Sequence, residues 1–292
     1  MPRKLEGYIF LTLAMVLVGS TVVASKIIAG GLPPFTATAL RFAIALPCFL
    51  VAMRLTGASW PRPGGRDRIM LAVQAAAGSV GYTTLLISGL RLTSATDAGV
   101  IIGTLPVVSA MIAIVLLRER PHRFLLLAIG LATAGVVAVA FPSGSGSARS
   151  FLGNALILGA VACEGLFILL NRRLDQAIPP LALSAIMTGI GLAASTLFAV
   201  FEAPWAAGFP AQAVAAVVYY ALVPTVGGFL FWYAGSARTS GTEAALFTAL
   251  APVSAVILAM VLLGEQVRLS QVAGIGCVLV AVASLVLARR PG

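Results

Sequence analysis

Charged residues and histidine are scarce in this chain. Only 10% of its 292 residues are charged, and His122 is the single histidine. One histidine excludes a multi-histidine metal site, and its place among basic residues argues against a conventional Ser-His-Asp triad. A phosphate loop of the form Gly-x-x-x-x-Gly-Lys-Ser/Thr is missing as well, which argues against an intrinsic ATPase. We therefore expect neither an enzyme nor a bound metal or cofactor.

Cysteines and long charged tracts are also scarce. Cys48, Cys163 and Cys277 lie within apolar runs and have neither disulfide nor metal-ligand spacing, so packing roles are expected. The net charge of +10 is spread over groups of one to four basic residues. This distribution argues against a nucleic-acid partner. The most charged interval, 56–68, is too short to fold as a separate domain.

Apolar sequence makes up most of the chain, which is 60% hydrophobic with a mean hydropathy of +1.05. A membrane-spanning helix needs roughly 20 mostly apolar residues, so we expect an all-α polytopic membrane protein in contact with the lipid bilayer. The first apolar run is long and lacks a clear cleavage site, which favours a retained helix over a signal peptide. Ten transmembrane helices are expected, at 7–29, 35–54, 69–90, 95–117, 123–141, 152–171, 181–201, 212–235, 241–263 and 270–288.

The stretch 93–119 occurs twice. At an offset of 146 residues, half the length of the chain, 239–265 repeats 11 of its 27 positions. Each copy opens with Ser-x-x-Asp or Ser-x-x-Glu, the pattern of a capping box. The shared positions include the first serine, the central proline and the final glutamate: Ser94/Ser240, Pro106/Pro252 and Glu119/Glu265. Glycines and prolines elsewhere recur at the same offset, which predicts a duplication of the whole chain.

Five helices in each copy would place the two copies in opposite orientations across the membrane. We therefore expect two five-helix inverted repeats, residues 1–146 and 147–292. If the N-terminus is cytoplasmic, 14 of the 19 basic residues lie in cytoplasmic segments, as the positive-inside rule requires. Both termini are thus expected in the cytoplasm. Inverted repeats are common in secondary transporters, although a channel or a membrane enzyme can also be duplicated.

These features resemble the drug/metabolite transporter superfamily, and most closely its EamA-like branch of ten-helix exporters. The resemblance rests on five plus five spans, internal termini and a Pro-centred fourth helix that ends in Glu119, and it covers the whole chain. The first helix departs from the family pattern, because Val18 replaces a common Trp and Gly19 lies seven residues before Lys26 rather than six. The resemblance implies an exporter of amino acids or related metabolites in the cell inner membrane, without ATP hydrolysis. We expect it to function as a monomer.

Glu164 is the most informative acidic residue. It lies roughly 17 Å into its predicted helix, where a carboxylate that faces lipid costs about 2.5–3.5 kcal/mol, so it should face the protein interior. Phe167, Ile168 and Asn171 follow on the same helical face. This face could bind an ammonium group or a proton. The alternative is a structural carboxylate bonded to a neighbouring helix, and the sequence favours neither.

Aromatic and proline residues supply the other candidates. Tyr82, Phe167 and Phe231 lie deep in their predicted helices, as the lining of a cavity for a hydrophobic or aromatic substrate would. Trp232 and Tyr233 lie nearer a helix end, where interfacial aromatic belts are common. The substrate-cavity candidates are therefore Tyr82, Glu164, Phe167, Asn171 and Phe231. The expected helix kinks, at residues that each remove a helical hydrogen bond, are Pro106, Pro224 and Pro252.

The remaining ionisable residues have more than one explanation. Lys26 is expected to reach the membrane interface, with a substrate carboxylate as the alternative. Arg41 lies deeper, and a substrate carboxylate, an ion pair and a backbone contact all remain open for it. The carboxylates of the repeated stretch are expected to stabilise helix ends, in part through the helix dipole: Asp97/Glu243 and Glu119/Glu265.

The sequence thus predicts a secondary transporter that exports amino acids, hydrophobic or aromatic ones first, by alternating access. Protons are a candidate coupling ion. A broad-specificity drug efflux carrier is the alternative within the class, and a phosphate-ester antiporter is less expected because few basic residues lie deep. A channel or a membrane scaffold without transport activity would have similar helices.

Overall fold

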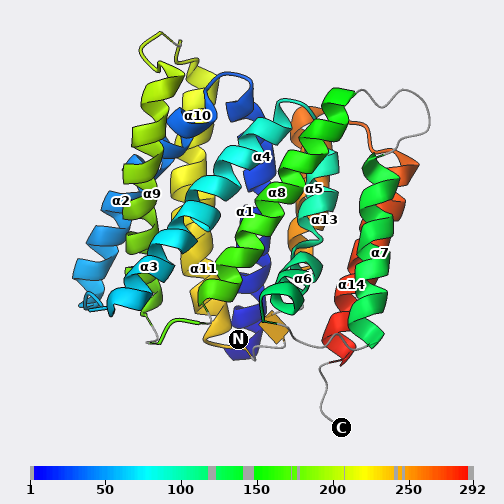
Figure 1. Ribbon diagram of the computed structural model, residues 1–292, viewed down its shortest axis with the longest axis horizontal. Helices are drawn as coiled ribbons and strands as arrows, with labels where there is room; N and C mark the ends of the chain where they lie inside the picture. The colour runs from blue at the N-terminus through cyan, green and yellow to red at the C-terminus, as the bar shows by residue number, and fades with distance from the viewer. Residues whose placement is uncertain are drawn as a thin grey trace.

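The computed structural model describes residues 3–117, 123–140, 148–171, 173–175, 178–206, 208–239, 243–244 and 247–288, and these form tilted helices without a strand (Figure 1). The described part of the chain is therefore all-α, as expected. Residues 118–122 and 141–147 lie outside this part, and with them Glu119, His122 and most of the segment that joins the two copies.

The first copy contains a short π-helical segment, η1, which continues α3 into α4. Its elements are α1 (Arg3–Ala29), α2 (Pro34–Thr56), α3 (Gly65–Gln74), η1 (Ala75–Gly81), α4 (Tyr82–Leu90), α5 (Ala95–Ile102), α6 (Leu105–Leu117) and α7 (Arg123–Ala140). α2 begins with a proline at its first position, which the missing N–H and fixed φ favour. It ends at Gly57, whose φ of 67° suits glycine at a helix C-terminus.

The second copy has the same order of elements. They are α8 (Ala148–Asn171), α9 (Pro180–Ala199), the 3₁₀ turn η2 (Val200–Glu202), α10 (Ala211–Tyr220), the π-helical η3 (Ala221–Gly227), α11 (Gly228–Ser236), α13 (Leu250–Leu263) and α14 (Leu269–Ala288). Several bounds recur at the 146-residue offset. η1 and η3 correspond residue for residue, and so do α3 and α10, and α4 and α11. A π-helix is rare, so two at matched positions indicate that the copies share local backbone structure.

Six helical segments of the described residues are long and apolar enough to cross a membrane. They are Lys4–Ala29, Pro34–Thr56, Gly65–Leu90, Ser150–Asn171, Pro180–Glu202 and Ala211–Ser236. α5 and α6 together would make a seventh, bent by 48° at the break between them. α13 and the described cores of α7 and α14 are shorter apolar helices. The chain is thus a helical protein with several candidate spans, and ten crossings stay a prediction.

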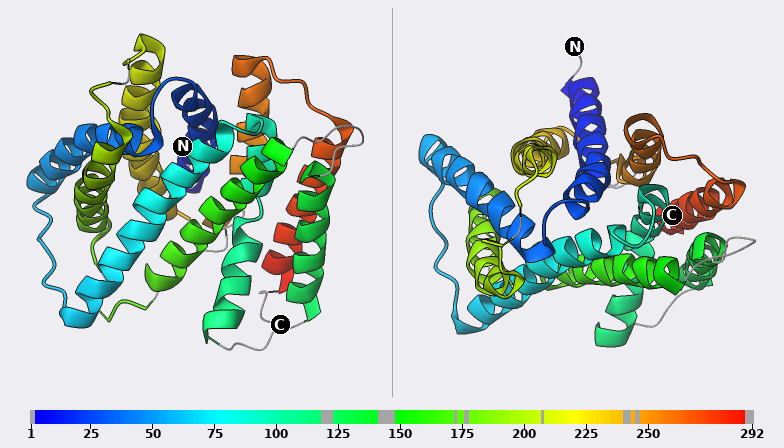
Figure 2. Two further views of the ribbon diagram at one scale, coloured as in Figure 1. Left: turned by 45° about the horizontal axis from the view of Figure 1, so that its top comes forward. Right: turned by 90° about the horizontal axis from the view of Figure 1, so that it is seen from above.

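Helices from the two copies pack against each other throughout. α2 lies along α9 and α7 lies along α14, while α1 contacts α11 and α13, and α8 contacts α4 and α6 (Figure 2). α1 begins and α14 ends at one side of the helix array, at the bottom of Figure 1. We call this the N-terminal side and the other the opposite side.

Glycines allow the closest of these approaches. A Cβ on Gly235 of α11 would lie 3.0 Å from the carbonyl oxygen of Gly7 in α1. A Cβ on Gly89 of α4 would lie 2.9 Å from the carbonyl oxygen of Gly153 in α8. Backbones approach in this way at membrane helix interfaces rich in small residues. Gly7 corresponds to Gly153 and Gly89 to Gly235 at the 146-residue offset, so the contact near one side has its counterpart near the other.

Candidate functional site

A cavity of about 1110 Å³ lies between the two copies. Its walls come from α1, α2, η1, α4, α5, α6, α8, α9, α10, η3, α11, α13 and α14. Most of the lining is apolar, but it also contains Arg41, Glu164, Asn171 and several hydroxyl groups. A large pocket with a few polar groups among apolar side chains is typical of small-molecule sites.

The lining runs from the middle of the helix array to the N-terminal side. It reaches Asn171 and Arg173 at the end of α8 and Tyr233 near the end of α11, all three of which are exposed. Within the described residues, 22–29 of α1 and 83–90 of α4 contribute no lining. The cavity is therefore open toward the N-terminal side and closed by packed helix ends on the opposite side.

Repeat-related positions line the cavity in pairs. Prolines and glycines line the cavity at matched positions of the two copies. Pro106 and Pro252 form one such pair, and Gly78 of η1 and Pro224 of η3 form another. The chemistry differs at other pairs, which are Val18/Glu164 and Arg41/Met187. Each copy thus contributes one charged group where the other copy has an apolar side chain.

Four of the five predicted cavity residues lie on this wall: Tyr82, Glu164, Phe167 and Asn171. Glu164, Phe167, Ile168 and Asn171 share one face of α8, as their spacing predicts. The Phe167 ring lies directly over Gly78, because a Cβ there would be 2.5 Å from Phe167 Cδ2. Gln74 Nε2 also donates to the Phe167 carbonyl oxygen at 3.1 Å. This part of α8 is therefore held tightly against the π-helical segment of the first copy.

Phe231 lies elsewhere, and its expected place in the lining is corrected. Its ring stacks on Phe10 with the centroids 5.9 Å apart, in an apolar cluster with α1 and α13. The neighbouring Trp232 and Tyr233, expected in an interfacial belt, line the cavity instead. The depth of a residue in a helix is readable from sequence, but the face it presents depends on how α11 is rotated, which the contacts with α1 determine.

Arg41, for which the sequence left several roles open, lies beside Tyr220 in the cavity wall. The Arg41 guanidinium carbon lies 4.5 Å from the ring centroid of Tyr220 and 4.4 Å from that of Phe42. Cation–π contacts of this kind stabilise a charge that is partly removed from water. The signal available in the sequence was an arginine deep in an apolar span without a partner at helical spacing.

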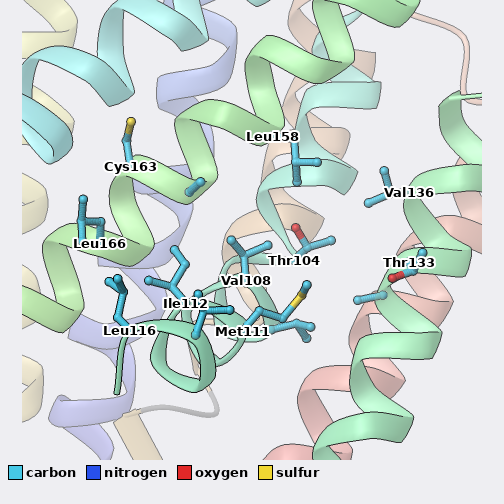
Figure 3. A pocket seen from close by; sticks show the side chains of 14 residues that line it. Thr104, Val108, Met111, Ile112, Leu116, Thr133, Val136, Leu158, Cys163 and Leu166 are labelled. Atoms are coloured by element: carbon cyan, nitrogen blue, oxygen red, sulfur yellow. The ribbon is translucent and has the colours of Figure 1, made fainter. Parts of the chain in front are cut away.

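A second hollow, of about 710 Å³, lies between α6, α7 and α8 (Figure 3). Its lining is almost wholly aliphatic, and the few polar side chains are Thr104, Thr133 and Cys163. Among the described residues, no charged side chain lines it. A zwitterion or an ion would lose its hydration there without compensation, so this hollow is not the candidate substrate site.

Helix ends on the opposite side are joined by charged side chains. Lys26 Nζ donates to the carbonyl oxygens of Leu90 at 2.7 Å and Thr93 at 2.6 Å. Arg91 donates to the carbonyl oxygens of Ala29 at 3.2 Å and Leu32 at 2.7 Å. These cations satisfy carbonyl groups that helix C-termini leave unpaired. Lys26 therefore bonds to protein backbone rather than extending to the interface.

Two carboxylates cap helix N-termini on the same side. Glu265 accepts from the backbone N–H groups of Ala95 at 2.9 Å and Thr96 at 2.8 Å, and from Thr96 Oγ1 at 2.6 Å. Glu202 accepts in the same way from Phe35 N at 3.0 Å, Thr36 N at 2.7 Å and Thr36 Oγ1 at 2.8 Å. Each carboxylate lies in the second copy and caps a helix of the first, α5 or α2. The repeat counterpart of Glu265, Glu119, lies outside the described residues.

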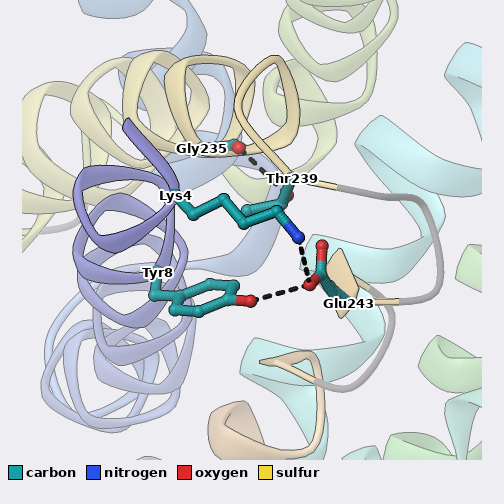
Figure 4. A network of polar contacts seen from close by, with 5 residues as sticks. All are labelled: Lys4, Tyr8, Gly235, Thr239 and Glu243. Atoms are coloured by element: carbon teal, nitrogen blue, oxygen red, sulfur yellow. Dashed lines mark hydrogen bonds and ion pairs between the residues drawn. The ribbon is translucent and has the colours of Figure 1, made fainter. Parts of the chain in front are cut away.

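The carboxylates of Asp97 and Glu243 accept hydrogen bonds from side chains of other helices. Ser94 Oγ accepts from Asp97 N at 3.0 Å, as the capping pattern predicts, while the Asp97 carboxylate accepts from Gln271 of α14. On the N-terminal side, Glu243 Oε1 accepts from Tyr8 Oη at 2.7 Å and from Lys4 Nζ at 3.4 Å (Figure 4). These carboxylates therefore have structural partners.

The predicted kink prolines all lie at irregular points of the helices. Pro106 follows the break between α5 and α6, where the chain bends by 48°. Pro224 lies within η3, and Thr225 Oγ1 donates to the Tyr220 carbonyl oxygen at 2.8 Å. Pro252 is the third residue of α13, just after a turn. Within the described residues, no three His, Cys, Asp or Glu side chains gather closely enough to hold a metal ion.

Comparison with known proteins identifies the family. The model of the EamA-like transporter family matches residues 5–141 and, a second time, residues 151–287. The chain belongs to the EamA-like transporter family. It is therefore a membrane-embedded, multi-pass protein, and its family and relatives are transporters rather than enzymes.

Relatives of this EamA-like transporter include proteins named only as transporters. It is 34% identical to the uncharacterized transporter YetK of Bacillus subtilis over 283 residues, which cover 95% of this chain and 86% of that protein. It is 31% identical to a probable terminal-alkyne amino-acid exporter of Streptantibioticus cattleyicolor over 215 residues, 70% of this chain and 68% of that one. A solved crystal structure of a chain 20% identical in sequence has a TM-score of 0.65 and covers 98% of this chain and 96% of its own. That structure shares the fold.

Proposed function

We propose that this protein is a secondary transporter that exports amino acids from the cytoplasm by alternating access. The proposal rests on the central cavity, which is open toward one side only and combines charged side chains of both signs with aromatic rings. Hydrophobic and aromatic amino acids fit this lining best, because Phe42, Tyr82 and Phe167 offer apolar contact to a side chain. A relative named as a probable amino-acid exporter supports the same substrate class.

Two inverted repeats, 1–146 and 147–292, are part of this proposal. The matched bounds of η1 and η3 support it, as do the paired glycine contacts near the two sides and the two separate family matches. A cavity at the junction of such repeats can be exposed to each side in turn when one copy moves against the other.

The cell inner membrane with cytoplasmic termini is the proposed location. Basic side chains favour this orientation, since Arg54, Arg62, Arg66 and Arg68 all lie in or beside the α2–α3 connection on the N-terminal side. In this orientation the cavity faces the cytoplasm, where an exporter takes up its substrate. We further propose that the transporter acts as a monomer, because the cavity is enclosed by helices of one chain.

The closed side favours a carrier over a channel. Lys26, Arg91, Glu202 and Glu265 join helix ends there through the contacts given above. A channel would need a continuous path, whereas a carrier needs one side closed while the other is open. Broad-specificity drug efflux is the second candidate, and the cavity size favours it, since 1110 Å³ exceeds the volume of about 300–1,000 Å³ typical of drug-sized sites.

Transport by purified protein in liposomes tests the proposal. We expect saturable uptake of labelled L-phenylalanine that is accelerated by unlabelled amino acid on the far side of the membrane. Flux that does not saturate would instead indicate a channel, and no flux across a broad panel of amino acids and drugs would indicate a scaffold. The same assay with and without a pH gradient tests proton coupling. An unchanged rate and pH dependence in Glu164→Gln would remove Glu164 from that coupling.

A further inference from the structure

Arg41 is the one arginine whose charge is buried in the wall of the cavity among the described residues. Arg41 is only 8% exposed, and it contributes to the lining from the first half of α2. Burying an arginine without a bonded anion is costly, because it gives up hydration for which nothing compensates. We therefore expect the buried charge to bind a negatively charged group.

One hydrogen-bond donor of the Arg41 side chain has no acceptor among the described residues. Its Nε is enclosed, yet no acceptor in the described part of the chain lies within hydrogen-bonding distance of it. Nε and the adjacent terminal nitrogen form one of the edges by which arginine binds a carboxylate through two parallel hydrogen bonds. The rings of Phe42 and Tyr220, 4.4 and 4.5 Å from the guanidinium carbon, hold this edge in place.

Glu164 supplies the opposite charge from the other copy. Its side chain lines the same cavity as that of Arg41. The two do not form an ion pair, because the ion pairs of the described residues, at N···O distances of 4.0 Å or less, all lie elsewhere. Two opposite charges that face one cavity without pairing leave a place between them for a molecule that carries both.

We propose that Arg41 forms a carboxylate subsite in the cavity, and that Glu164 receives the ammonium group of the same zwitterion. This inference rests on the proposed function and names the groups that recognise the substrate class. It also explains the two asymmetric repeat pairs, since Met187 and Val18 stand where Arg41 and Glu164 would otherwise be duplicated. A zwitterion needs one site for each charge. Tyr82 lines the same cavity.

Binding of three probes that share a phenyl ring tests the inference on the purified full-length protein. L-Phenylalanine has both charges, 3-phenylpropionate has only the carboxylate, and 2-phenylethylamine has only the ammonium group. Arg41→Met, which copies the residue of the other repeat, should weaken binding of both carboxylates by about 10-fold or more, since charge-assisted hydrogen bonds are lost. It should leave binding of the amine unchanged or tighter. Glu164→Gln should weaken binding of L-phenylalanine and of the amine and leave binding of 3-phenylpropionate unchanged.

Arg41→Lys and Arg54→Met complete the series. Arg41→Lys keeps the charge without the two-donor edge, so we expect a smaller loss of affinity that is still selective for the carboxylate probes. If Arg41→Met does not fold, the result with Arg41→Lys tests the subsite. Arg54→Met makes the same substitution on α2 at an exposed residue outside the cavity lining, and this variant should bind all three probes as the wild type does. Equal affinity changes for all probes in the Arg41 variants, or no change, would overturn the subsite.

Failure of the subsite and failure of the proposed function give different results. If the wild type transports L-phenylalanine but the Arg41 variants keep its preference for carboxylates, the subsite is wrong and amino-acid transport stands. If the wild type transports no amino acid but binds 3-phenylpropionate in an Arg41-dependent way, the subsite stands and the proposed function is wrong. If the wild type binds neither carboxylate probe, the subsite is overturned.

Discussion

Single carboxylates connect the two copies on the side of the molecule where the cavity is closed. Glu265 and Glu202 each accept two backbone N–H groups and one threonine hydroxyl at the start of a helix in the first copy. A carboxylate at this position satisfies donors that a helix start leaves free and interacts favourably with the helix dipole. Any motion that opens this side by separating the copies must weaken these caps.

Glu265→Gln should destabilise the protein measurably. The amide keeps one acceptor oxygen but loses the charge that favours the N-terminus of α5, at a cost of about 1–2 kcal/mol. We expect the unfolding temperature in detergent to fall by roughly 2–8 °C. Glu6→Gln is the matched control, because Glu6 is 42% exposed in a loose contact of 3.7 Å with Arg238, and exposed pairs of this kind contribute little. Equal shifts in both variants would contradict a specific role for the Glu265 cap.

Elements of the molecule deviate from regular α-helix where they border the cavity. η1 and η3 are π-helical and contribute Gly78, Ser79, Pro224 and Thr225 to the lining. π-Helical turns are frequent at functional sites, since the widened turn leaves carbonyl groups and small side chains accessible. The break before α6 and the turn before α13 lie at equivalent places of the two copies. The irregular segments therefore surround the site in matched pairs.

Pro106→Ala tests whether the break between α5 and α6 serves movement. Alanine supplies the missing N–H and removes the ring that would clash with the preceding turn, so the two helices can become more nearly continuous. We expect transport to slow by roughly 3- to 10-fold with little change in substrate affinity, because a conformational step rather than binding is affected. Pro204→Ala, in the connection between η2 and α10, should leave the rate unchanged. A changed affinity with an unchanged rate would indicate a binding role instead.

Paired glycines predict paired effects on stability. Gly89→Ala and Gly235→Ala should each lower the unfolding temperature by several degrees, because the added methyl group would lie within 3.0 Å of a backbone carbonyl oxygen across the helix interface. Gly130 and Gly276 are the controls, since they are also 146 residues apart and a Cβ on either meets nothing within 4 Å. Alanine there should be neutral or slightly stabilising. A loss of stability at only one of the two close contacts would argue against equivalent interfaces.

The whole molecule has an open and a closed side, and the proposed orientation places the open side toward the cytoplasm. Trp60, in the connection between α2 and α3, is 56% exposed on the N-terminal side. Trp205, in the connection between η2 and α10, is 73% exposed on the opposite side. These two positions therefore report on the two sides of the membrane.

Thiol labelling of intact cells tests the proposed orientation. In a chain whose native cysteines are replaced by alanine, Trp205→Cys should react with a membrane-impermeant reagent, and Trp60→Cys should react only after the cells are opened. The basic residues near Trp60 predict this result through the positive-inside rule. The reverse pattern would place the termini outside, and labelling of both positions in intact cells would contradict a single orientation. The native cysteines to be replaced are Cys48, Cys163 and Cys277.

The sequence by itself determined the class of the protein, the positions of its apolar helices and the 146-residue repeat. These features are local or periodic, since a helix start, an apolar run or a repeated Pro-Val can be recognised without knowing its neighbours. The common face of Glu164, Phe167 and Asn171 follows from helical spacing for the same reason. The resemblance to the EamA-like family also rests on such local features, and the family match has confirmed it.

Only the tertiary structure decided which side chains meet. Arg41 and Tyr220 are 179 residues apart in the chain, and their contact depends on how α2 and α10 pack. Phe231 and Trp232 are neighbours in sequence, yet only Trp232 lines the cavity, because adjacent residues of a helix point about 100° apart. Lys26 and Glu265 could be placed near helix ends from the sequence, but their partners come from other helices. The lining of the candidate site thus arises from packing between distant segments.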